Sequence, residues 1–445
     1  MILRFLCGFA MLLSTWLGGK AYASEFLIGV TAHILGNHTD PALFIEHAQA
    51  SGMNSIRVEP LWSAVEQEKG IYAFPPELMP LQEAVDRSVL RGFRPLVILN
   101  YGNQFYDRGS YPVSEEAQAA FARYAQYIAT RLKGKVRIYE VWNEWNAGTG
   151  FPSPPPFDKS TSARHFARLV GAANAAIKQV DPDATVLIGG LGYRDLEWLL
   201  EVVGNAGAHY DGIAMHPYNF ADGDGPSGDG NKPEEVARWL DNANERIFRK
   251  TGRLVPFYIT EIGWPDHIGA SGISQAAVAQ YVARMLLLAS SRAYVRGVWW
   301  YGYQDDGSDP HDPEHHFGLV NKEGVPKPAL HALRATASLI KSADRPRSCQ
   351  TDEFLSCLVF TGGDNRLTYV LWSPRNVELV VAVLSDGPST DISAQAIITP
   401  ADRRTLRTGS GSTGRIRVSG MPVVINGGGA DLRFEVASRV MSPAR

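Results

Sequence analysis

The chain is poor in cysteine and has no excess of positive charge, and each of these absences excludes a class of protein. Three of its 445 residues are cysteine, and the formal net charge is -3 at pH 7. Nucleic-acid-binding domains usually carry a basic patch, so the charge balance argues against nucleic acid as a partner. The sequence also lacks the Cys-x-x-Cys and His-Glu-x-x-His spacings of zinc sites and the Gly-x-Ser-x-Gly turn of serine hydrolases.

Long apolar runs are also missing, apart from one at the N-terminus. Arg4 precedes an apolar stretch from Phe5 to Gly18, which is shorter than the roughly 20 residues of a membrane-spanning helix. Ala21-Tyr22-Ala23 then resembles a signal-peptidase site. We expect residues 1–23 to be a secretory signal that is cleaved near Ala23, with an uncleaved anchor as the alternative. The mature chain is then periplasmic or secreted and has no transmembrane segment.

The number of cysteines in the mature chain is consistent with export. Cys7 lies in the expected signal, so the mature chain keeps only Cys349 and Cys357. Two cysteines in an exported chain pair more often than not, and this pair would close a small loop. A free, buried pair is the alternative.

Short β-rich runs alternate with longer amphipathic stretches over residues 24–340. This alternation predicts βα units with a parallel sheet, and eight runs are the number found in a (β/α)8 TIM barrel. A doubly wound open sheet is the rival fold, but the glycine-rich phosphate turn typical of its first strand does not follow Val30. The expected strands are Phe26–Thr31, Ser55–Val58, Pro95–Asn100, Val136–Asn143, Thr185–Gly190, Gly212–His216, Pro256–Glu261 and Gly297–Gly302. The expected helices are Ala42–Ala50, Glu77–Arg91, Glu115–Leu132, Ala163–Val180, Pro233–Thr251 and Gln275–Ala289.

The pattern changes after about Ser342, where strand-like runs are separated by Gly, Ser, Pro and Asp without a helical pattern between them. We expect residues 341–445 to form a small antiparallel β-sandwich. The segment shows no catalytic constellation, so we expect it to support the barrel, with polysaccharide contact as the alternative role. The runs are Leu367–Trp372, Val377–Leu384, Ala396–Thr399, Arg415–Val418 and Leu432–Val436.

Polar and aromatic residues gather at the ends of the predicted barrel strands, which is the face where barrel enzymes keep their active sites. Two of them are glutamates, Glu144 and Glu261, and each breaks off an apolar, β-branched run. A buried carboxylate needs specific partners, and either glutamate alone could simply end its strand in a salt bridge. The other residues of this kind include Arg57, Asn143, His216, Tyr218, Trp299 and Trp300.

Two carboxylates that face each other across a cavity are what the cleavage of a glycosidic bond requires. Strands 4 and 7 of an eight-stranded barrel stand nearly opposite each other, so we expect Glu144 and Glu261 to face each other. One must carry a proton as the acid while the other is ionised as the nucleophile. Trp142 and Trp145 flank Glu144, and we expect them to raise the pKa of its carboxyl through desolvation.

The partners of the second carboxylate can also be predicted. Arg57 and Tyr218 are the candidates to hold Glu261 in its ionised form. Glu140 shares a strand face with Glu144 but lies four residues deeper, so we interpret it as a buried ion-pair partner inside the barrel.

Two long loops are predicted over the same face, Asp222–Gly230 and Tyr303–Phe317. The second loop is rich in Asp, Glu and His, which could bind a metal. It lacks the regular ligand spacing of known metal sites, however, so we interpret it as a solvated loop that shapes the substrate site and expect no metal.

Together these residues resemble the clan A glycoside hydrolases. In that clan an Asn-Glu pair on strand 4 supplies the acid/base and a glutamate on strand 7 is the nucleophile, which is the pattern of Asn143-Glu144 and Glu261. The segment Arg57–Trp62 is similar to the clan's second strand, and His216-Pro217-Tyr218 to the motif on its sixth. Within the clan the chain is most like family 39, which contains β-xylosidases and bacterial endoglycosidases of exopolysaccharide systems. Family 5 cellulase-like enzymes are the close rival.

The resemblance implies a retaining glycosidase that needs no cofactor and acts on a β-linked or equatorial glycoside. Glu144 would be the acid/base and Glu261 the nucleophile, while Asn143 would contact the 2-hydroxyl of the sugar. Trp300 is the expected sugar platform on strand 8, with Trp299 as the alternative. The implied substrate-binding residues are Arg57, Asn143, His216, Tyr218 and Trp300.

The leading hypothesis is an exported, monomeric glycosidase that acts on a polysaccharide or oligosaccharide. Aromatic residues in several loops, at Tyr101, Trp145 and Trp264, favour a cleft with more than one sugar subsite and therefore endo action. Bacterial exopolysaccharide is the expected substrate, and xylan or β-glucan are the alternatives. Two other functions stay open, namely a barrel that binds carbohydrate without turnover and an assembly factor in polysaccharide export.

Overall fold

The computed structural model describes residues 25–440 apart from residues 32, 35–39, 152–155, 207–208, 224–229, 350–352, 386–389, 410–412, 428 and 430. The expected signal over residues 1–23 therefore lies outside the described residues, as does most of the loop Asp222–Gly230. Among the described helices, none combines the length and the apolar character needed to cross a membrane.

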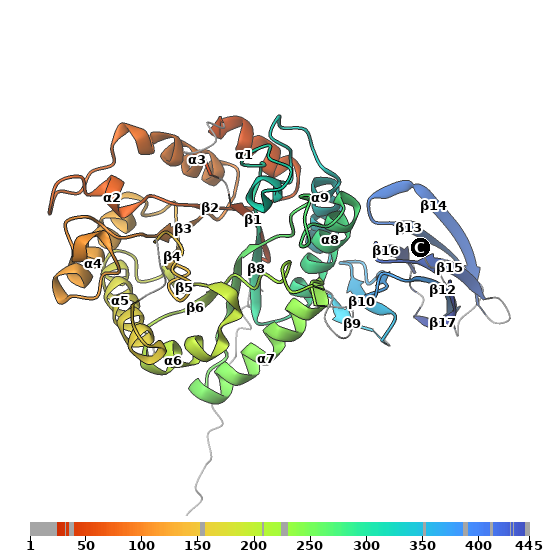
Figure 1. Ribbon diagram of the computed structural model, residues 1–445. Coiled ribbons are helices and arrows are strands. Elements are labelled where there is room, and N and C mark those ends of the chain that lie inside the picture. The colour runs from red at the N-terminus through yellow and green to blue at the C-terminus, as the bar shows by residue number, and fades with distance from the viewer. Residues whose placement is uncertain are drawn as a thin grey trace, which may run out of the picture.

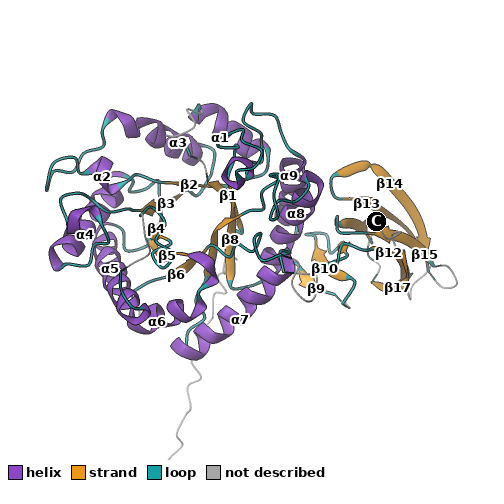
Figure 2. Ribbon diagram, viewed as in Figure 1, coloured by secondary structure: helices purple, strands orange, loops and turns teal. Residues whose placement is uncertain are grey.

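Eight parallel strands close into a barrel in the order β1 to β8, and the helices surround it (Figures 1 and 2). This confirms the predicted (β/α)8 barrel. Its strands are almost entirely buried, which explains why they appear in the sequence as continuous apolar runs. The strands are β1 (Leu27–Thr31), β2 (Ser55–Val58), β3 (Leu96–Leu99), β4 (Ile138–Asn143), β5 (Thr185–Leu191), β6 (Gly212–Met215), β7 (Phe257–Ile262) and β8 (Val295–Tyr301). The helices are α1 (Pro41–Ala50), α2 (Trp62–Val65), α3 (Met79–Leu90), α4 (Glu115–Arg131), α5 (Lys159–Val180), α6 (Leu196–Ala206), α7 (Pro233–Thr251), α8 (Gln275–Ser291) and α9 (Pro328–Lys341).

Helices α2 and α9 were not among the predicted helices, and neither was α6. Its buried positions recur at helical spacing, at Leu196, Leu199, Val202 and Val203. Several other helices begin at a side-chain cap. Ser114 before α4, for example, accepts a hydrogen bond from the backbone N–H of Ala117, which satisfies one of the free donors at the helix start.

An apolar layer fills one end of the barrel interior. It contains one side chain from each strand except β2, and the indole N–H of Trp299 donates to Ser55 Oγ over 3.0 Å. The barrel is therefore a packed core at this end and not a pore. The members of the layer are Leu27, Leu96, Ile138, Leu187, Ala214, Tyr258 and Trp299.

The remaining strands form two antiparallel sheets, which confirms the predicted β-sandwich. One sheet has the order β14-β13-β16-β11-β10-β9 and the other the order β15-β12-β17. The run Ala396–Thr399 was predicted as a strand, but Ile397 and Ile398 form the turn between β13 and β14. The strands are β9 (Arg347–Ser348), β10 (Ser356–Thr361), β11 (Leu367–Trp372), β12 (Glu378–Ser385), β13 (Thr390–Ala396), β14 (Thr399–Thr408), β15 (Gly414–Val418), β16 (Val423–Asn426) and β17 (Leu432–Val440).

The sandwich packs beside α8 and α9 (Figure 1). The outer face of its larger sheet joins the core of the barrel through Leu358, Phe360, Val370 and Trp372. A buried ion pair lies at the same contact, because Arg284 Nε on α8 donates to Glu234 Oε1 over 2.9 Å. This extensive contact fits the expectation that the second domain supports the barrel.

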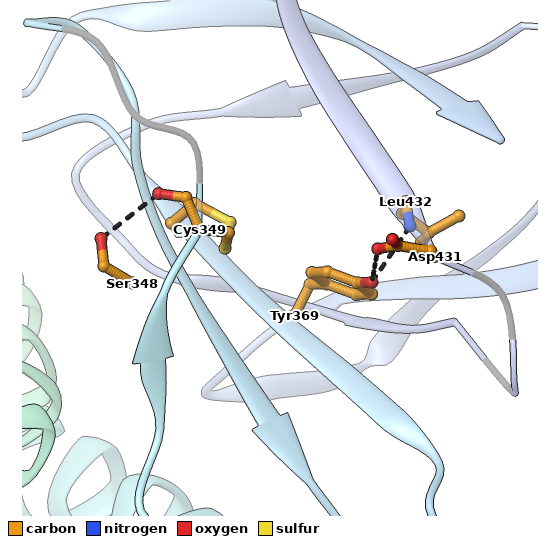
Figure 3. The surroundings of a disulfide bond; sticks show 6 residues. Ser348, Cys349, Tyr369, Asp431 and Leu432 are labelled. Carbon is orange, nitrogen blue, oxygen red and sulfur yellow. Dashed lines mark hydrogen bonds between the residues drawn. A yellow bond between two sulfur atoms is a disulfide. The ribbon is translucent and has the colours of Figure 1, made fainter. Parts of the chain in front are cut away.

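A disulfide joins Cys349 to Cys357 near the start of the sandwich, as predicted (Figure 3). The backbone N–H of Cys349 also donates to the carbonyl of Cys357 over 3.1 Å. The bond therefore ties the segment after β9 to the first residues of β10.

Candidate active site

A polar layer of Glu140, His216 and Thr260 lies next to the apolar layer, on the side of the carboxyl ends of the strands. Side chains two positions apart on a strand point to the same face, so the inward positions that follow Ile138 and Ala214 belong to Glu140 and His216. Both side chains are 0 % exposed. The layer is held by hydrogen bonds across the barrel, because Thr260 Oγ1 on β7 lies 3.0 Å from His216 Nε2 and 3.3 Å from Glu140 Oε1.

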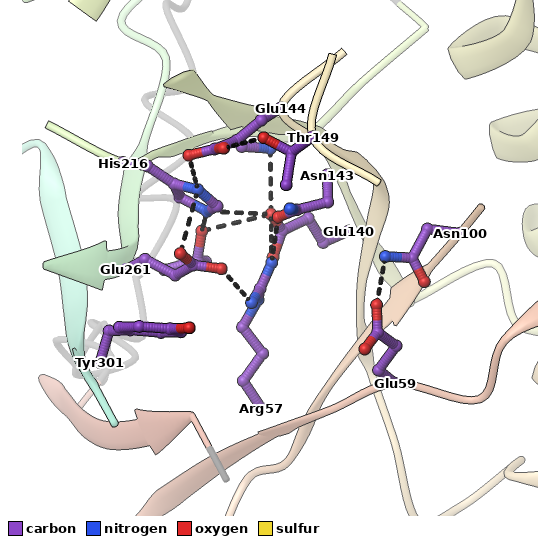
Figure 4. Close-up of polar contacts among 12 residues, drawn as sticks. Arg57, Glu59, Asn100, Glu140, Asn143, Glu144, Thr149, His216, Glu261 and Tyr301 are labelled. Carbon is purple, nitrogen blue, oxygen red and sulfur yellow. Dashed lines mark hydrogen bonds and ion pairs between the residues drawn. The ribbon is translucent and has the colours of Figure 1, made fainter. Parts of the chain in front are cut away.

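Arg57 on β2 crosses the barrel and contacts both the polar layer and the end of β7 (Figure 4). Its Nε donates to Glu140 Oε2 over 2.9 Å, and its Nη1 donates to Glu261 Oε1 over 2.6 Å. Tyr218 donates from its hydroxyl to the other oxygen, Glu261 Oε2, over 3.0 Å. Both partners predicted for Glu261 are therefore in contact with it. Glu140 is also the buried ion-pair partner that the sequence predicted.

Glu144 follows β4 with a left-handed backbone, φ 45°, that turns its carboxylate towards β6. Oε1 lies 2.9 Å from His216 Nδ1, and Oε2 accepts from the hydroxyl of Thr149. Burial by itself raises the pKa of Glu144, but the hydrogen bond and charge of His216 outweigh it and lower the pKa below its ordinary value.

This result corrects the prediction that the neighbouring tryptophans raise the pKa of Glu144. Trp142 and Trp145 turn away from the carboxylate and pack against aromatic residues of α4 and α5, such as Phe121 and Phe166. The adjacent tryptophans do not set the environment of Glu144. A histidine 72 residues away does.

His216 and Glu140 carry strongly shifted pKa values of opposite direction. Burial lowers the pKa of His216, but the negative charge of Glu261 and hydrogen bonds to Glu140 and Glu144 raise it to about 9. Burial raises the pKa of Glu140, but the charge of Arg57 lowers it to about 2. At neutral pH the imidazolium of His216 therefore lies against the carboxylates of Glu140 and Glu144.

A cavity of about 690 Å³ opens above this layer, which is within the range of about 300–1,000 Å³ typical of small-ligand sites. Five of the seven predicted site residues line it, namely Arg57, Asn143, Glu144, Tyr218 and Glu261. Asn143 accepts from Arg57 Nη2 over 3.0 Å and donates to the hydroxyl of Tyr101 over 2.9 Å. The aromatic lining is Tyr101, Tyr193, Tyr218, Phe220, Tyr301 and Phe317.

The other two predicted residues, His216 and Trp300, do not line the cavity. His216 was predicted to bind substrate, but it is fully buried beneath the carboxylates and can act on a substrate through them alone. Trp300 was predicted as the sugar platform, but its indole is 3 % exposed, packs on Trp264 and donates to the carbonyl of Phe317.

The alternation of β8 explains the position of Trp300. Trp299 points into the apolar layer, so the next inward residue is Tyr301, and the intervening Trp300 points outwards. Tyr301 lines the cavity and donates to Glu314 Oε2 over 3.2 Å. Neither tryptophan lines the cavity at this position, and Tyr301 was not among the predicted substrate-binding residues because the phase of the strand was not known.

The acidic and histidine-rich loop Tyr303–Phe317 is held by contacts within the loop and with neighbouring segments. Asp305 Oδ1 accepts from Lys327 Nζ over 2.8 Å, and His311 and His316 contact the backbone carbonyls of Ile268 and Asp309. Among the described residues, the group of carboxylates and imidazoles within metal-binding reach is instead Glu144, His216 and Glu261. A metal ligand must be deprotonated, and the raised pKa of His216 opposes that use.

A family model described as Cellulase (glycosyl hydrolase family 5) matches residues 20–305 of the chain. The chain belongs to this family. It is therefore a clan A glycoside hydrolase with a carbohydrate substrate, which confirms the clan predicted from Asn143-Glu144 and Glu261. A search of curated proteins gives no match.

Three solved structures that share the fold come from three different families of glycoside hydrolase. A family 39 glycoside hydrolase from the gut symbiont Bacteroides cellulosilyticus WH2 has a TM-score of 0.71 and 22% identity, with 91% of this chain and 81% of that chain covered. GH5_18 from Streptomyces cattleya in complex with GlcNAc has a TM-score of 0.58 and 17% identity, with 72% and 81% covered. The catalytic domain of GH30 xylanase C from Talaromyces cellulolyticus has a TM-score of 0.60 and 11% identity, with 90% and 96% covered.

The sequence comparison and the structure comparison favour different families of the clan. The sequence matches family 5, which was held as the close rival, whereas the likeness to the family 39 structure extends over 91% of the chain. That coverage exceeds the length of the barrel, so the likeness to the family 39 fold includes part of the β-sandwich.

Proposed function

We propose that the chain is a retaining endo-glycosidase of polysaccharides, with Glu144 as the acid/base and Glu261 as the nucleophile. The observation that carries the proposal is the spacing of the two carboxylates, which each bring an oxygen within 4.8 Å of the other and of His216. Retaining enzymes hold these groups about 5–5.5 Å apart, whereas inverting enzymes leave about 6.5–9.5 Å for a water molecule. The short spacing favours direct attack by Glu261.

In the first step an oxygen of Glu261 attacks the anomeric carbon while the bond to the leaving oxygen breaks. Glu144 donates its proton to that oxygen, and the leaving sugar departs with a hydroxyl group. Arg57 and Tyr218 hold the two oxygens of Glu261 and so fix its direction of attack. Burial raises the pKa of Tyr218, so its hydroxyl keeps the proton that it donates.

In the second step a water molecule takes the place of the leaving sugar. Glu144 accepts one proton of that water, the oxygen attacks the anomeric carbon, and the bond to Glu261 breaks. Two inversions at one carbon give retention. We propose that Asn143, which lines the cavity beside Glu144, contacts the 2-hydroxyl of the reacting sugar.

The proton for the first step is supplied by the pair of Glu144 and His216. In the free enzyme the raised pKa of His216 and the lowered pKa of Glu144 place the proton on the imidazole. Transfer across the 2.9 Å hydrogen bond protonates Glu144 and leaves a neutral His216. No water chain is needed, because the two atoms already touch.

The substrate we propose is a β-linked polymer, with bacterial exopolysaccharide first and xylan or β-glucan as alternatives. Of the aromatic residues expected to form sugar subsites, Tyr101 lines the cavity, but Trp145 and Trp264 are buried and do not. Tyr193, Phe220 and Phe317 line it instead and support a site with more than one sugar subsite. We also propose that the protein is exported after removal of residues 1–23, which mass spectrometry of the secreted and periplasmic fractions would test.

The test of the function is reducing-end release by residues 24–445 on xylan, glucans, mannans and the producing organism's own secreted polysaccharide. We expect one class of polymer to be cut, with products of several lengths. Proton NMR during the first minutes should show the β-anomer at the new reducing end. Appearance of the α-anomer first would rule out retention.

Glu261→Gln is the matched control, because it keeps the shape of the side chain and removes the nucleophile. We expect no reducing ends from this variant and unchanged binding of the same polymer. If the wild-type protein cuts nothing while both proteins bind one polymer tightly, a binding or export-assembly role would replace the hydrolytic one.

A further inference from the structure

Tyr193 is an exposed aromatic residue at the wall of the catalytic cavity. Its side chain is 83 % exposed, and the residue lines the cavity together with Glu144 and Thr149. It lies in the turn between β5 and α6 with a left-handed backbone, φ 53° and ψ 19°, and Arg194 beside it also has φ 53°. Two consecutive left-handed residues with large side chains are costly, and such outliers concentrate at functional sites.

The turn that carries Tyr193 is held from both sides. The side-chain amide of Asn146 donates to the carbonyl of Gly192 over 2.8 Å and accepts from its N–H over 3.1 Å. Arg194 forms an ion pair with Asp222, and Asp195 accepts from Lys159 Nζ over 2.9 Å. The exposed ring is therefore presented by a fixed backbone.

The position of the turn places Tyr193 on the Glu144 side of the cavity. A Cβ atom on Gly192, the residue before it, would lie 3.2 Å from Glu144 Cδ. Gly192 therefore lies beside the acid/base with little room for a side chain between them, and Tyr193 is the next residue. The general acid protonates the oxygen of the leaving group, so the sugar that departs must lie on this same side.

We propose that Tyr193 is the platform for the sugar on the leaving-group side of the scissile bond. This inference rests on the proposed function and on the role of Glu144 in it. The face of a pyranose ring that carries axial C–H bonds is apolar and packs flat on an aromatic ring. Tyrosine offers that area at a low cost in conformational entropy. A rigid turn beside the acid/base lets the ring orient the leaving sugar while Glu144 protonates its oxygen.

The test compares two substrates that share the non-leaving sugars and differ in the leaving group. One is the polymer that the wild-type protein cuts in the panel above, and the other is a 4-nitrophenyl oligoglycoside of the same repeat. Tyr193→Ala should reduce kcat/KM on the polymer about tenfold more than on the aryl glycoside, because nitrophenol is too good a leaving group to need the platform. Tyr193→Phe should restore the wild-type ratio.

Phe248→Ala is the matched control, because Phe248 is also an exposed aromatic residue, 46 % exposed, but lies on α7 and does not line the cavity. It should leave the ratio between the two substrates unchanged. An equal loss on both substrates in Tyr193→Ala, or no loss on the polymer, would overturn the inference. Failure of the proposed function would look different, since the wild-type protein would release no reducing ends from any polymer, and the inference would fall with it.

Discussion

His216 Nδ1 lies 2.9 Å from Glu144 Oε1, so the proposed acid/base shares a proton with an imidazole that is fully buried. The second ring nitrogen of His216 contacts the hydroxyl of Thr260 over 3.0 Å, which fixes the plane of the ring. A carboxylate and a histidine in this arrangement titrate as a pair, and the pair keeps its last proton until the pKa of about 9 is reached.

Replacing His216 with Asn is expected to move the alkaline limb of the kcat/KM profile to lower pH. In the wild-type protein that limb should lie near pH 9, where the pair loses its last proton. In the variant Glu144 must hold its proton alone, so the limb should fall by more than about one pH unit. Thr149→Val is the control, because Thr149 also contacts Glu144 but does not carry the shared proton. A limb that stays near pH 9 in His216→Asn would contradict this account.

The same histidine should make the stability of the protein depend on pH. A group whose pKa is raised on folding contributes stability below its unfolded value, 6.5 for histidine, and that contribution is lost as the pH rises through about 9. The free energy of unfolding of the wild-type protein should therefore fall between pH 6.5 and pH 9. His216→Asn should show a shallower fall, measured by urea unfolding at both pH values. Parallel slopes in the two proteins would contradict the raised pKa.

Arg57→Met is expected to destabilise the protein and also to inactivate it. The variant leaves Glu140 buried without the guanidinium, its nearest cationic partner, and loss of one member of a buried pair costs about 3–5 kcal/mol. It also removes the donor to Glu261 Oε1. Adding Glu140→Gln should recover much of the stability measured by urea unfolding, because the buried charge is gone. Recovery of activity in the double variant would show that the contact with Glu261 is dispensable.

The barrel could be predicted from the sequence because its strands are buried on both faces and stand out as apolar, β-branched runs. The two glutamates could be predicted because each ends such a run. The partner of Glu144 could not, because His216 lies 72 residues away and only the closed barrel brings it to the carboxylate. Trp142 and Trp145, the sequence neighbours of Glu144, suggested that the pKa of Glu144 is raised, because the sequence does not show that their rings turn away from the carboxylate.

The errors at Trp300 and at Ile397 have a similar origin. Side chains of β8 alternate between the inside and the outside of the barrel, but the sequence does not show which of two adjacent residues faces inwards. In the structure Tyr301 holds the inward position and Trp300 does not. Ile397 and Ile398 appeared to extend a strand because they are apolar. Ile397 is 5 % exposed because this turn packs into the core shared with the barrel. An apolar turn of this kind cannot be separated from a strand without its tertiary contacts.

Removal of the disulfide with Cys349→Ser and Cys357→Ser is expected to weaken the second domain and leave catalysis unchanged. The bond spans a sequence separation of 8, and the loss of so short a constraint on the unfolded chain corresponds to about 2.5 kcal/mol. The cavity residues all lie in the barrel. Thermal unfolding with and without a reducing agent gives the measurement, and the reducing agent should have no effect on the double variant. A large loss of kcat would mean that the sandwich shapes the active site.

Arg284→Met tests whether the two domains unfold as one unit. Arg284 is 0 % exposed and links α8 to Glu234 on α7 and to Asn376 of the sandwich, where its Nη1 donates over 2.6 Å. In the variant the buried Glu234 keeps one donor from the sandwich, the indole N–H of Trp372. Loss of the guanidinium from this buried pair costs about 3–5 kcal/mol of stability. We therefore expect the wild-type protein to unfold in one calorimetric transition and the variant in two, with the sandwich melting first.

Arg246→Met is the matched control for this interface. Arg246 pairs with Glu197 on the surface of the barrel, where both side chains are exposed and the pair is screened by water. Its loss should leave both the number of transitions and their midpoints unchanged. If Arg284→Met behaves in the same way, the apolar contacts of Phe360 and Trp372 hold the domains together without the ion pair. A split transition in Arg284→Met alone would show that the buried ion pair couples the two domains.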